Sequence, residues 1–274
     1  MRAVAPPGGV RLTYVNAWPF EDRGYNDLPD DDTRAAVLDA ALARIARMEP
    51  DRILIACNTL SILFARTAFS RTSGIPVHGI IDAGADLFDE RLHDDFAASI
   101  VLTGTKTTIE SGVHRARLEA RGVDPRRIGA AHCHGLAAAI ERDVDGPHVA
   151  ALIEECAARA FAAAPPGAAL FLGLCCTHYG YVGVRLVDAI ARRSGRRVRA
   201  LDPNLRLVGD LLAGGTFFGG QAPAAGAVGG VTVEVLSKVT LSETARAGIA
   251  RLVEPVSPPT AAALLSYALV PGLF

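Results

Sequence analysis

Short apolar segments alternate with longer amphipathic segments along most of the chain. The short segments are rich in Val, Ile and Leu, and each has the length of a buried strand. Expected strands cover residues 11–15, 52–56, 75–81, 98–104, 169–174, 197–202 and 231–238. Apolar residues with helical spacing predict helices over residues 33–48, 108–121, 147–163, 180–193 and 242–253. Strands that alternate with helices are typical of largely parallel sheets flanked by helices, so the predicted fold class is α/β.

Polar residues mark the start of two of these helices. Asp31, Asp32 and Thr33 are of the types that cap a helix N-terminus, and Ser242 is expected to cap the last helix. The strand before that helix is expected to be the last strand. Residues 215–230 are rich in glycine and alanine, and this composition predicts a loop or linker.

The composition and charge of the chain limit the kinds of molecule that it is expected to bind. The 274 residues are half apolar, which allows a large core in one domain or in two smaller lobes. Lys and Arg number 28 and Asp and Glu 29, which gives a formal net charge of −1. This balance provides no general attraction to nucleic acid or to an anionic membrane, so neither is an expected partner. An anionic ligand must be held by local groups.

The sequence predicts a soluble, cytoplasmic protein. Two prolines and two glycines interrupt the first ten residues, which therefore lack the hydrophobic segment of a signal peptide. Apolar stretches elsewhere fall short of the roughly 18 residues that a membrane-spanning helix needs. The apolar C-terminal stretch is interrupted by Pro271.

Five cysteines, at positions 57, 133, 156, 175 and 176, form an odd set without the spacing of a disulfide framework. They predict free thiols in a reducing compartment rather than structural disulfides. Cys156, inside an expected helix, and Cys175 have the character of small apolar core residues.

Cys57 and Cys176 differ from the others because each follows an expected buried strand and precedes small hydroxylic residues. Ligands of open α/β sheets bind beyond the carboxyl ends of the strands. Backbone N–H groups at such a position favour a thiolate, which is a base. Two thiols on opposite faces of one carbon can remove a proton on one side and return a proton on the other. That chemistry inverts a stereocentre.

Two segments around these cysteines resemble a known family. ACNTLS at 56–61 and CCTHYGY at 175–181 closely resemble the two cysteine signatures of glutamate racemases, which belong to the aspartate/glutamate racemases. IPVHGIIDAG at 75–84 and TGTKTTIESGVHRARL at 103–118 extend the resemblance. Together the similar segments cover most of residues 10–205.

The resemblance implies a role for each residue in a matching position. Cys57 and Cys176 would be the catalytic acid/base pair, with His178 assisting the second thiol and Glu141 supporting that histidine. Contacts with the substrate are implied for Asn58, Thr59, Thr105, Thr108, Thr177, Pro19 and Phe20. The expected partner is a small-molecule amino-acid substrate, converted without a cofactor or a bound metal, and the D-amino acid would serve peptidoglycan synthesis.

The resemblance also implies two pseudo-equivalent α/β lobes with the ligand cleft between them. The first lobe would combine residues 1–94 with 204–274, and the second would hold residues 95–203. Each lobe would then supply one cysteine. The sequence leaves open whether two copies form a homodimer.

The chain departs from the family's pattern near its start. The family opens with a strand that runs into an Asp-Ser-Gly turn, whereas residues 11–20 correspond to its second strand and the following turn. Asn16 stands where aspartate is usual, and Pro19-Phe20-Glu21 replaces Pro-Tyr-Gly. Two explanations stay open: a chain that starts late, or divergence towards another substrate or towards binding without catalysis.

Glutamate is the expected substrate, and aspartate is the next candidate. A protein that binds a carboxylate or amino acid without catalysis is an alternative of a different class. A zinc site at His132-Cys133-His134 or at Cys175-Cys176-His178 would lack a full set of ligands. A cysteine hydrolase based on Cys176 and His178 would leave Cys57 without a role.

Overall fold

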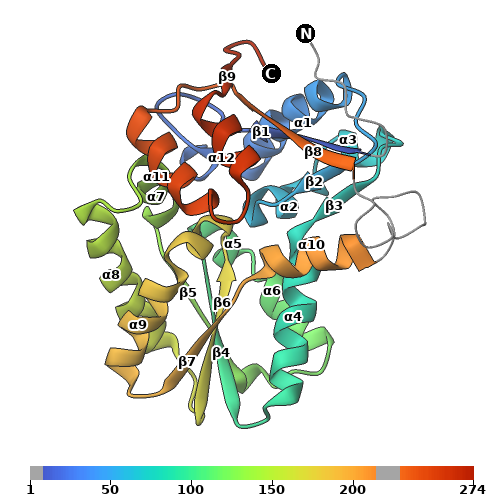
Figure 1. Cartoon of the computed structure of the whole chain (residues 1–274). Coiled ribbons are helices and arrows are strands. Elements are labelled where there is room, and N and C mark those ends of the chain that lie inside the picture. Colours follow the sequence, from blue (N-terminus) through green and yellow to red (C-terminus); the bar gives the residue numbers. More distant parts are fainter. Residues whose placement is uncertain (1–8, 214–228) are drawn as a thin grey trace. The chain divides into compact units, whose positions relative to one another are not determined.

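The computed structural model describes residues 9–213 and 229–274 (Figure 1). The chain divides into two compact units, which we call unit 1 and unit 2. Unit 1 comprises Met1–Pro50, Arg66–Thr72 and Asp210–Phe274, and unit 2 comprises Asp51–Ala65 and Ser73–Gly209. The lobes expected from the sequence, 1–94 with 204–274 and 95–203, divide the chain differently over residues 51–65, 73–94 and 204–209. They stay a prediction.

Unit 2 contains two parallel sheets. The larger has the strand order β5-β4-β6-β7 and the smaller pairs β2 with β3. Their bounds are Ile53–Ile55 for β2, Val77–Gly79 for β3, Ala98–Gly104 for β4, Ile128–His132 for β5, Ala169–Cys175 for β6 and Arg197–Leu201 for β7. Every residue of β4 is buried, as expected for a central strand with the apolar run Ile-Val-Leu at its middle.

Helices cover both faces of the larger sheet. Helices α8 and α9 lie on one side of it, and α4 and α6 lie on the other (Figure 1). The helices of unit 2 are α2 (Asn58–Phe64), α4 (Ile80–Asp94), α5 (Lys106–Glu110), α6 (Val113–Ala120), α7 (Leu136–Arg142), α8 (Pro147–Ala163), α9 (Gly183–Ser194) and α10 (Pro203–Ala213), which ends in unit 1, with the 3-10 helices η2 (Pro125–Arg127) and η3 (Thr177–Val182).

The core of unit 2 lies between the larger sheet and helices α4 and α6. Ile100 and Leu102 of β4 pack in one buried cluster with Phe88 and Leu92 of α4 and Leu118 of α6. Burial of each such side chain contributes about 1.5–3 kcal/mol. This packing fixes the strands whose carboxyl ends carry the candidate site residues.

Unit 1 contains a parallel sheet of order β1-β8-β9. Its strands are β1 (Gly9–Asn16), β8 (Gly229–Ser237) and β9 (Ala268–Leu269). Its helices are α1 (Asp31–Ala46), α3 (Phe69–Thr72), α11 (Glu243–Val253) and α12 (Pro258–Leu265), with the 3-10 helix η1 (Tyr25–Asp27). Ser242 caps α11 by accepting a hydrogen bond from the N–H of Ala245, as expected.

The prediction of an α/β fold with parallel sheets flanked by helices is confirmed. Several expected boundaries were wrong. Residues 108–121 form two helices, because Gly112 adopts a left-handed φ of 66° between α5 and α6. Residues 180–182 are 3-10 helix, and α9 begins at Gly183. Strand β5 was not expected at all.

Three further expectations were wrong: the residue that caps α1, the last helix and the last strand. Asp30, rather than a residue at 31–33, caps α1 by accepting the N–H of Thr33. Helix α12 and strand β9 follow the helix and strand expected to be the last. The loop expected over residues 215–230 lies almost wholly outside the described residues.

No helix in the described ranges is both long and apolar enough to cross a bilayer.

Candidate functional site

The carboxyl ends of three adjacent strands bring the candidate residues together in unit 2. Gly104, the last residue of β4, pairs with Cys175 at the end of β6 and with His132 at the end of β5. The residues that follow these strand ends are Thr105, Cys176 and Cys133. They therefore lie at one edge of the sheet, the edge where α/β proteins bind ligands.

Cys57 is the residue that immediately precedes helix α2, with an extended φ of −83° and ψ of 124°. The residue has an exposed surface, although protein atoms also surround its sulfur. Displacement of water by surrounding protein raises the pKa of the Cys57 thiol, and the backbone N–H of Leu60 opposes this rise. The charge of Cys176 raises the pKa of Cys57 further. Cys57 is therefore held as a neutral thiol, a proton donor.

A hydrogen bond joins the two cysteine-bearing segments. The hydroxyl of Thr177 donates to the carbonyl of Ala56, so the residue after Cys176 contacts the residue before Cys57. Thr177 was expected to contact the substrate. Its hydroxyl proton is used within the protein, where it links the two segments, and its expected contact with the substrate stays a prediction.

Cys176 begins a chain of three interacting side chains. It caps η3, and the His178 side chain, two residues on, hydrogen-bonds its sulfur. Nε2 of His178 lies 2.5 Å from Oε2 of Glu141 on α7. Thiol, imidazole and carboxylate are thus connected in sequence, an arrangement that couples proton movement at sulfur to a charged imidazole.

Charges along this chain stabilise an imidazolium. Burial alone lowers the pKa of His178, but its hydrogen bonds to Cys176 and Glu141, with their charges, outweigh burial and raise the pKa well above the ordinary value of 6.5. Burial raises the pKa of Glu141, and the contact with His178 outweighs this and lowers it below 4.5. The pair is therefore ionised across the neutral pH range.

Three threonine hydroxyls form a closed triangle next to Cys57. Oγ1 of Thr59 lies 3.0 Å from Oγ1 of Thr105 and 3.0 Å from Oγ1 of Thr108. Oγ1 of Thr105 donates to Oγ1 of Thr108 at 3.0 Å and also caps α5. Hydroxyls in such a ring can rotate to donate to an anion, because each is both donor and acceptor. The three expected residues are thus brought together.

Asn58 is buried beside this triangle and is paired with a histidine that the sequence did not single out. Nε2 of His114 on α6 lies 2.9 Å from Oδ1 of Asn58, and both side chains are 2% exposed. The sequence held a usable signal, because His114 precedes the apolar residue Leu118 by one helical turn, and Leu118 is buried in the structure. A histidine on that apolar face requires a buried partner.

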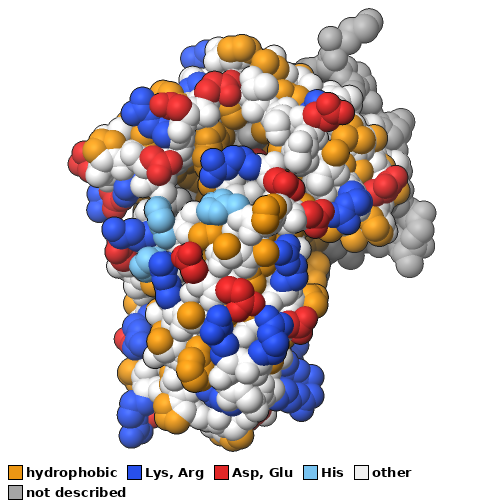
Figure 2. Space-filling view, turned by 90° about the vertical axis from the view of Figure 1, so that its left-hand side faces the viewer, with side chains coloured by type: hydrophobic (Ala, Val, Ile, Leu, Met, Phe, Trp, Pro, Cys, Tyr) orange, Lys and Arg blue, Asp and Glu red, His pale blue; other side chains and the backbone are white. Residues whose placement is uncertain are grey.

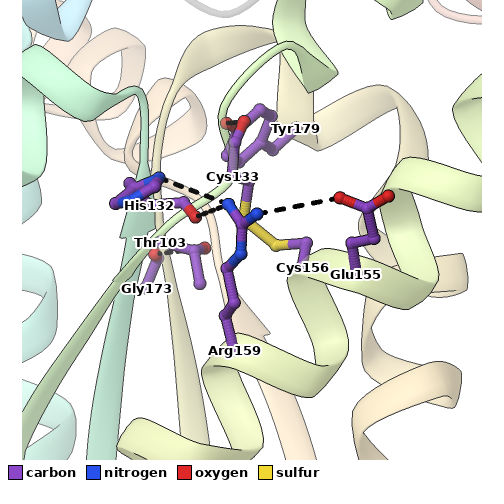
Figure 3. The surroundings of a disulfide bond; sticks show 8 residues. All are labelled: Thr103, His132, Cys133, Glu155, Cys156, Arg159, Gly173 and Tyr179. Carbon is purple, nitrogen blue, oxygen red and sulfur yellow. Dashed lines mark hydrogen bonds and ion pairs between the residues drawn. A yellow bond between two sulfur atoms is a disulfide. The ribbon is translucent and has the colours of Figure 1, made fainter.

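The expectation of free cysteines throughout was wrong at two positions. Cys133 after β5 and Cys156 on α8 form a disulfide (Figure 3). The carbonyl of Cys133 accepts a hydrogen bond of 3.0 Å from the hydroxyl of Tyr179, a fully buried residue of η3. Figure 3 shows Arg159 of α8 reaching His132 beside this bond. The disulfide therefore ties α8 to the segment that supports η3.

The sequence offered little signal for this disulfide. Cys133 and Cys156 are separated by 23 residues, and only the packing of α8 against β5 brings their Cα atoms to 5.0 Å. Tyr179 was likewise unassigned. In the CCTHYGY segment the sequence indicated roles for the thiol and the imidazole only. Tyr179 anchors the turn that carries them.

Three other residues are not part of this cluster: Cys175 is a core residue, and Pro19 and Phe20 belong to unit 1. Cys175 is fully buried in the core, and burial raises the pKa of its thiol strongly. Pro19 and Phe20 belong to unit 1, where Pro19 is buried and the cations of Arg23 and Lys238 lie 5.2 Å and 5.1 Å from the centre of the Phe20 ring. Their expected contact with the substrate stays a prediction.

No group of three or more potential metal ligands occurs within residues 9–213 and 229–274. The sulfur of Cys133, one of the ligands of a hypothetical zinc site, is bonded to Cys156. Acidic and basic side chains are interspersed on the face shown in Figure 2, in keeping with the balanced composition.

The sequence and the fold of this chain are similar to those of known proteins. Residues 1–205 match the family model described as Asp/Glu/Hydantoin racemase. A glutamate racemase of Campylobacter jejuni subsp. jejuni is 36% identical over 93 residues, which are 34% of this chain and 36% of the relative. That alignment therefore spans only about a third of the curated relative's length.

Solved structures of glutamate racemases share the fold. The enzyme from Campylobacter jejuni subsp. jejuni has a TM-score of 0.67 at 20% identity, covering 90% of this chain and 100% of that chain. The enzyme from Francisella tularensis subsp. tularensis SCHU S4, solved in complex with D-glutamate, has a TM-score of 0.60 at 17% identity, covering 96% and 97%. On the family match over residues 1–205, the chain belongs to the Asp/Glu/hydantoin racemases, a family of isomerases.

Proposed function

We propose that this chain racemises an acidic amino acid without a cofactor, and that Cys57 and Cys176 are the acid/base pair. The observation that carries the proposal is the chain of contacts from Glu141 through His178 to Cys176, in a segment tied by Thr177 to that of Cys57. One thiol faces a charged imidazole and the other is held neutral. A base and an acid are thus available at once.

The reaction follows from this asymmetry. The Cys176 thiolate, stabilised by the His178 imidazolium, takes the α-proton from one face of the substrate and becomes a thiol. The neutral Cys57 thiol donates its proton to the opposite face and becomes a thiolate. The net change is inversion at the α-carbon, which loses one proton to Cys176 and gains one from Cys57. The reverse reaction starts from the opposite protonation states.

The electron pair left on the α-carbon delocalises into the substrate carboxylate, which therefore needs hydrogen-bond donors. The hydroxyls of Thr59, Thr105 and Thr108 would take that role, which is supported by their mutual contacts near the start of α2 and α5. Glutamate is the first candidate substrate, because the relatives are named glutamate racemases and one was solved with D-glutamate. Aspartate is the second. Substrate contacts of Pro19 and Phe20, a cytoplasmic location, a homodimer and a role in peptidoglycan synthesis stay predictions.

The experiment is exchange of the α-hydrogen in deuterium oxide, followed by mass spectrometry for L- and D-glutamate and for L- and D-aspartate. We expect exchange together with racemisation for at least one of them. Cys57→Ala and Cys176→Ala should each abolish racemisation. A protein that binds these amino acids without exchange is a binding protein, and the racemase proposal then fails. Full racemisation by either single variant contradicts the two-thiol mechanism.

A further inference from the structure

His114 lies outside the thiol, imidazole and carboxylate chain but contacts the residue next to Cys57. Its ring is buried under α4, with a centroid 5.9 Å from that of Phe88. A Cβ atom on Gly84 would come within 3.3 Å of its Cε1 atom, so α4 confines the ring from a second side. The ring is therefore fixed in place, with Nε2 directed at Asn58.

The charge state of His114 decides which atom carries its proton. Burial, with a smaller effect from the Arg117 charge, lowers the pKa of His114 to about 4, so the imidazole is neutral near pH 7. A neutral imidazole has one N–H group. Because Oδ1 of Asn58 is only an acceptor, the proton resides on Nε2 and is donated to Asn58.

This contact fixes the orientation of the Asn58 amide. With Oδ1 held by His114, the Nδ2 donor points away from His114, and it is buried without a hydrogen-bond partner among the described residues. Buried donors are normally satisfied, and one that lacks a partner in the protein is left to bind a water molecule or a ligand. In the sequence, Asn58 stands between Cys57 and Thr59 of the threonine triangle, and an amide N–H binds an acceptor such as a carboxylate oxygen.

We propose that His114 is a positioning residue that holds the Asn58 amide with Nδ2 free to donate to a carboxylate oxygen of the substrate. The inference rests on the proposed function and adds a specific donor to it. Without His114 the amide can rotate or flip, and a flipped amide would present Oδ1 to the carboxylate. Substrate binding would weaken, whereas the thiols would keep their positions.

The test compares racemisation by His114→Phe, which keeps a ring and removes the donor, with His114→Gln, which retains an N–H donor. We expect His114→Phe to raise KM about tenfold to a hundredfold with a smaller change in kcat, because a contact made before and during proton transfer is lost. His114→Gln should recover most of this loss. Thermal unfolding checks that both variants are folded.

A double-mutant cycle separates positioning from a general structural effect. If His114 acts through Asn58, the KM of His114→Phe/Asn58→Ala should equal that of Asn58→Ala alone. Multiplying effects, or a wild-type KM in His114→Phe, overturn the inference while leaving the racemase proposal intact. A wild-type protein that neither exchanges the α-hydrogen nor binds an acidic amino acid, measured by calorimetry with D- and L-glutamate, overturns both.

Discussion

Oε2 of Glu141 lies 2.5 Å from Nε2 of His178, and this contact joins α7 to the turn that carries Cys176. The carboxylate raises the pKa of His178 and so extends the pH range in which the imidazolium exists. Glu141→Gln removes the charge with little change in shape. We expect kcat to fall at least about tenfold and the alkaline limit of the activity profile to move to lower pH, measured as kcat against pH.

Glu119→Gln provides the matched control, because Glu119 is a surface carboxylate on α6 paired with Arg115 at 3.1 Å. It should leave the profile unchanged. An alkaline limit in Glu141→Gln equal to that of the wild type would show that Glu141 does not support His178.

Adjacent cysteines should differ sharply in their effect on activity. Cys175 is buried in the core with its thiol kept neutral, whereas Cys176 contacts His178. Cys175→Ala should lower the free energy of unfolding by about 1–2 kcal/mol and leave kcat within about threefold. Cys176→Ala should abolish racemisation with a smaller effect on stability. Equal losses of activity in both variants would argue against the assignment of Cys176.

The Cys133–Cys156 disulfide should make stability depend on redox conditions. Closing a loop with a sequence separation of 23 is worth about 3 kcal/mol in the chain-entropy account. A reductant should therefore lower the free energy of unfolding by about that amount, measured by urea denaturation. Without reductant, thiol titration of the unfolded protein should find the three cysteines that are free, at 57, 175 and 176.

A Cys133→Ala/Cys156→Ala variant is the control, since its stability should no longer respond to the reductant. Five titratable thiols in the untreated wild type would contradict the disulfide.

Buried His114 should make stability fall in mild acid. Its pKa is about 4 in the folded protein and 6.5 as the ordinary value, so the unfolded chain binds the proton first as pH falls. The cost is absent above pH 6.5 and grows as pH falls to about 4, reaching up to about 3 kcal/mol. The stability of the wild type relative to His114→Phe should follow this course in denaturation curves from pH 4 to 8. A difference that does not vary with pH would mean that the pKa of His114 is the same in the folded and the unfolded chain.

Elements with a strong local pattern were predictable from the sequence. Strand β4 and helix α8 were expected at their observed bounds, because β4 has the apolar run Ile-Val-Leu at its centre and α8 begins with Pro147 at its first turn. Cys57 and Cys176 were recognisable because each follows an apolar strand and precedes small polar residues. Local chemistry sufficed at these places.

Features that depend on contacts distant in sequence were not predictable. The disulfide exists because α8 packs on β5, and the partner of His114 is 56 residues away. Helix α12 and strand β9 have short or alanine-rich sequences that carry weak signals. In each case the tertiary neighbour, rather than the residue's own segment, determines the structure.

Strand β5 was missed because its sequence, Ile-Gly-Ala-Ala-His, has only one of the branched and aromatic residues that favour strands. Packing explains the small residues. A Cβ atom at Gly129 would lie 2.1 Å from the carbonyl oxygen of Ala163 at the end of α8, and 3.0 Å from Cδ of Pro165. Backbone occupies the space that a side chain would need, so β5 could not carry a typical strand residue there.

Gly129→Ala should therefore lower the free energy of unfolding by about 3 kcal/mol or more, because α8 must shift to admit the methyl group. Gly74→Ala is the matched control, since a Cβ atom at Gly74 meets no atom within 4 Å. It should change stability by less than about 0.5 kcal/mol. Urea denaturation of the two variants measures the difference. Equal stability would mean that α8 can withdraw from β5 at little cost, and the small residues of β5 would then need another cause.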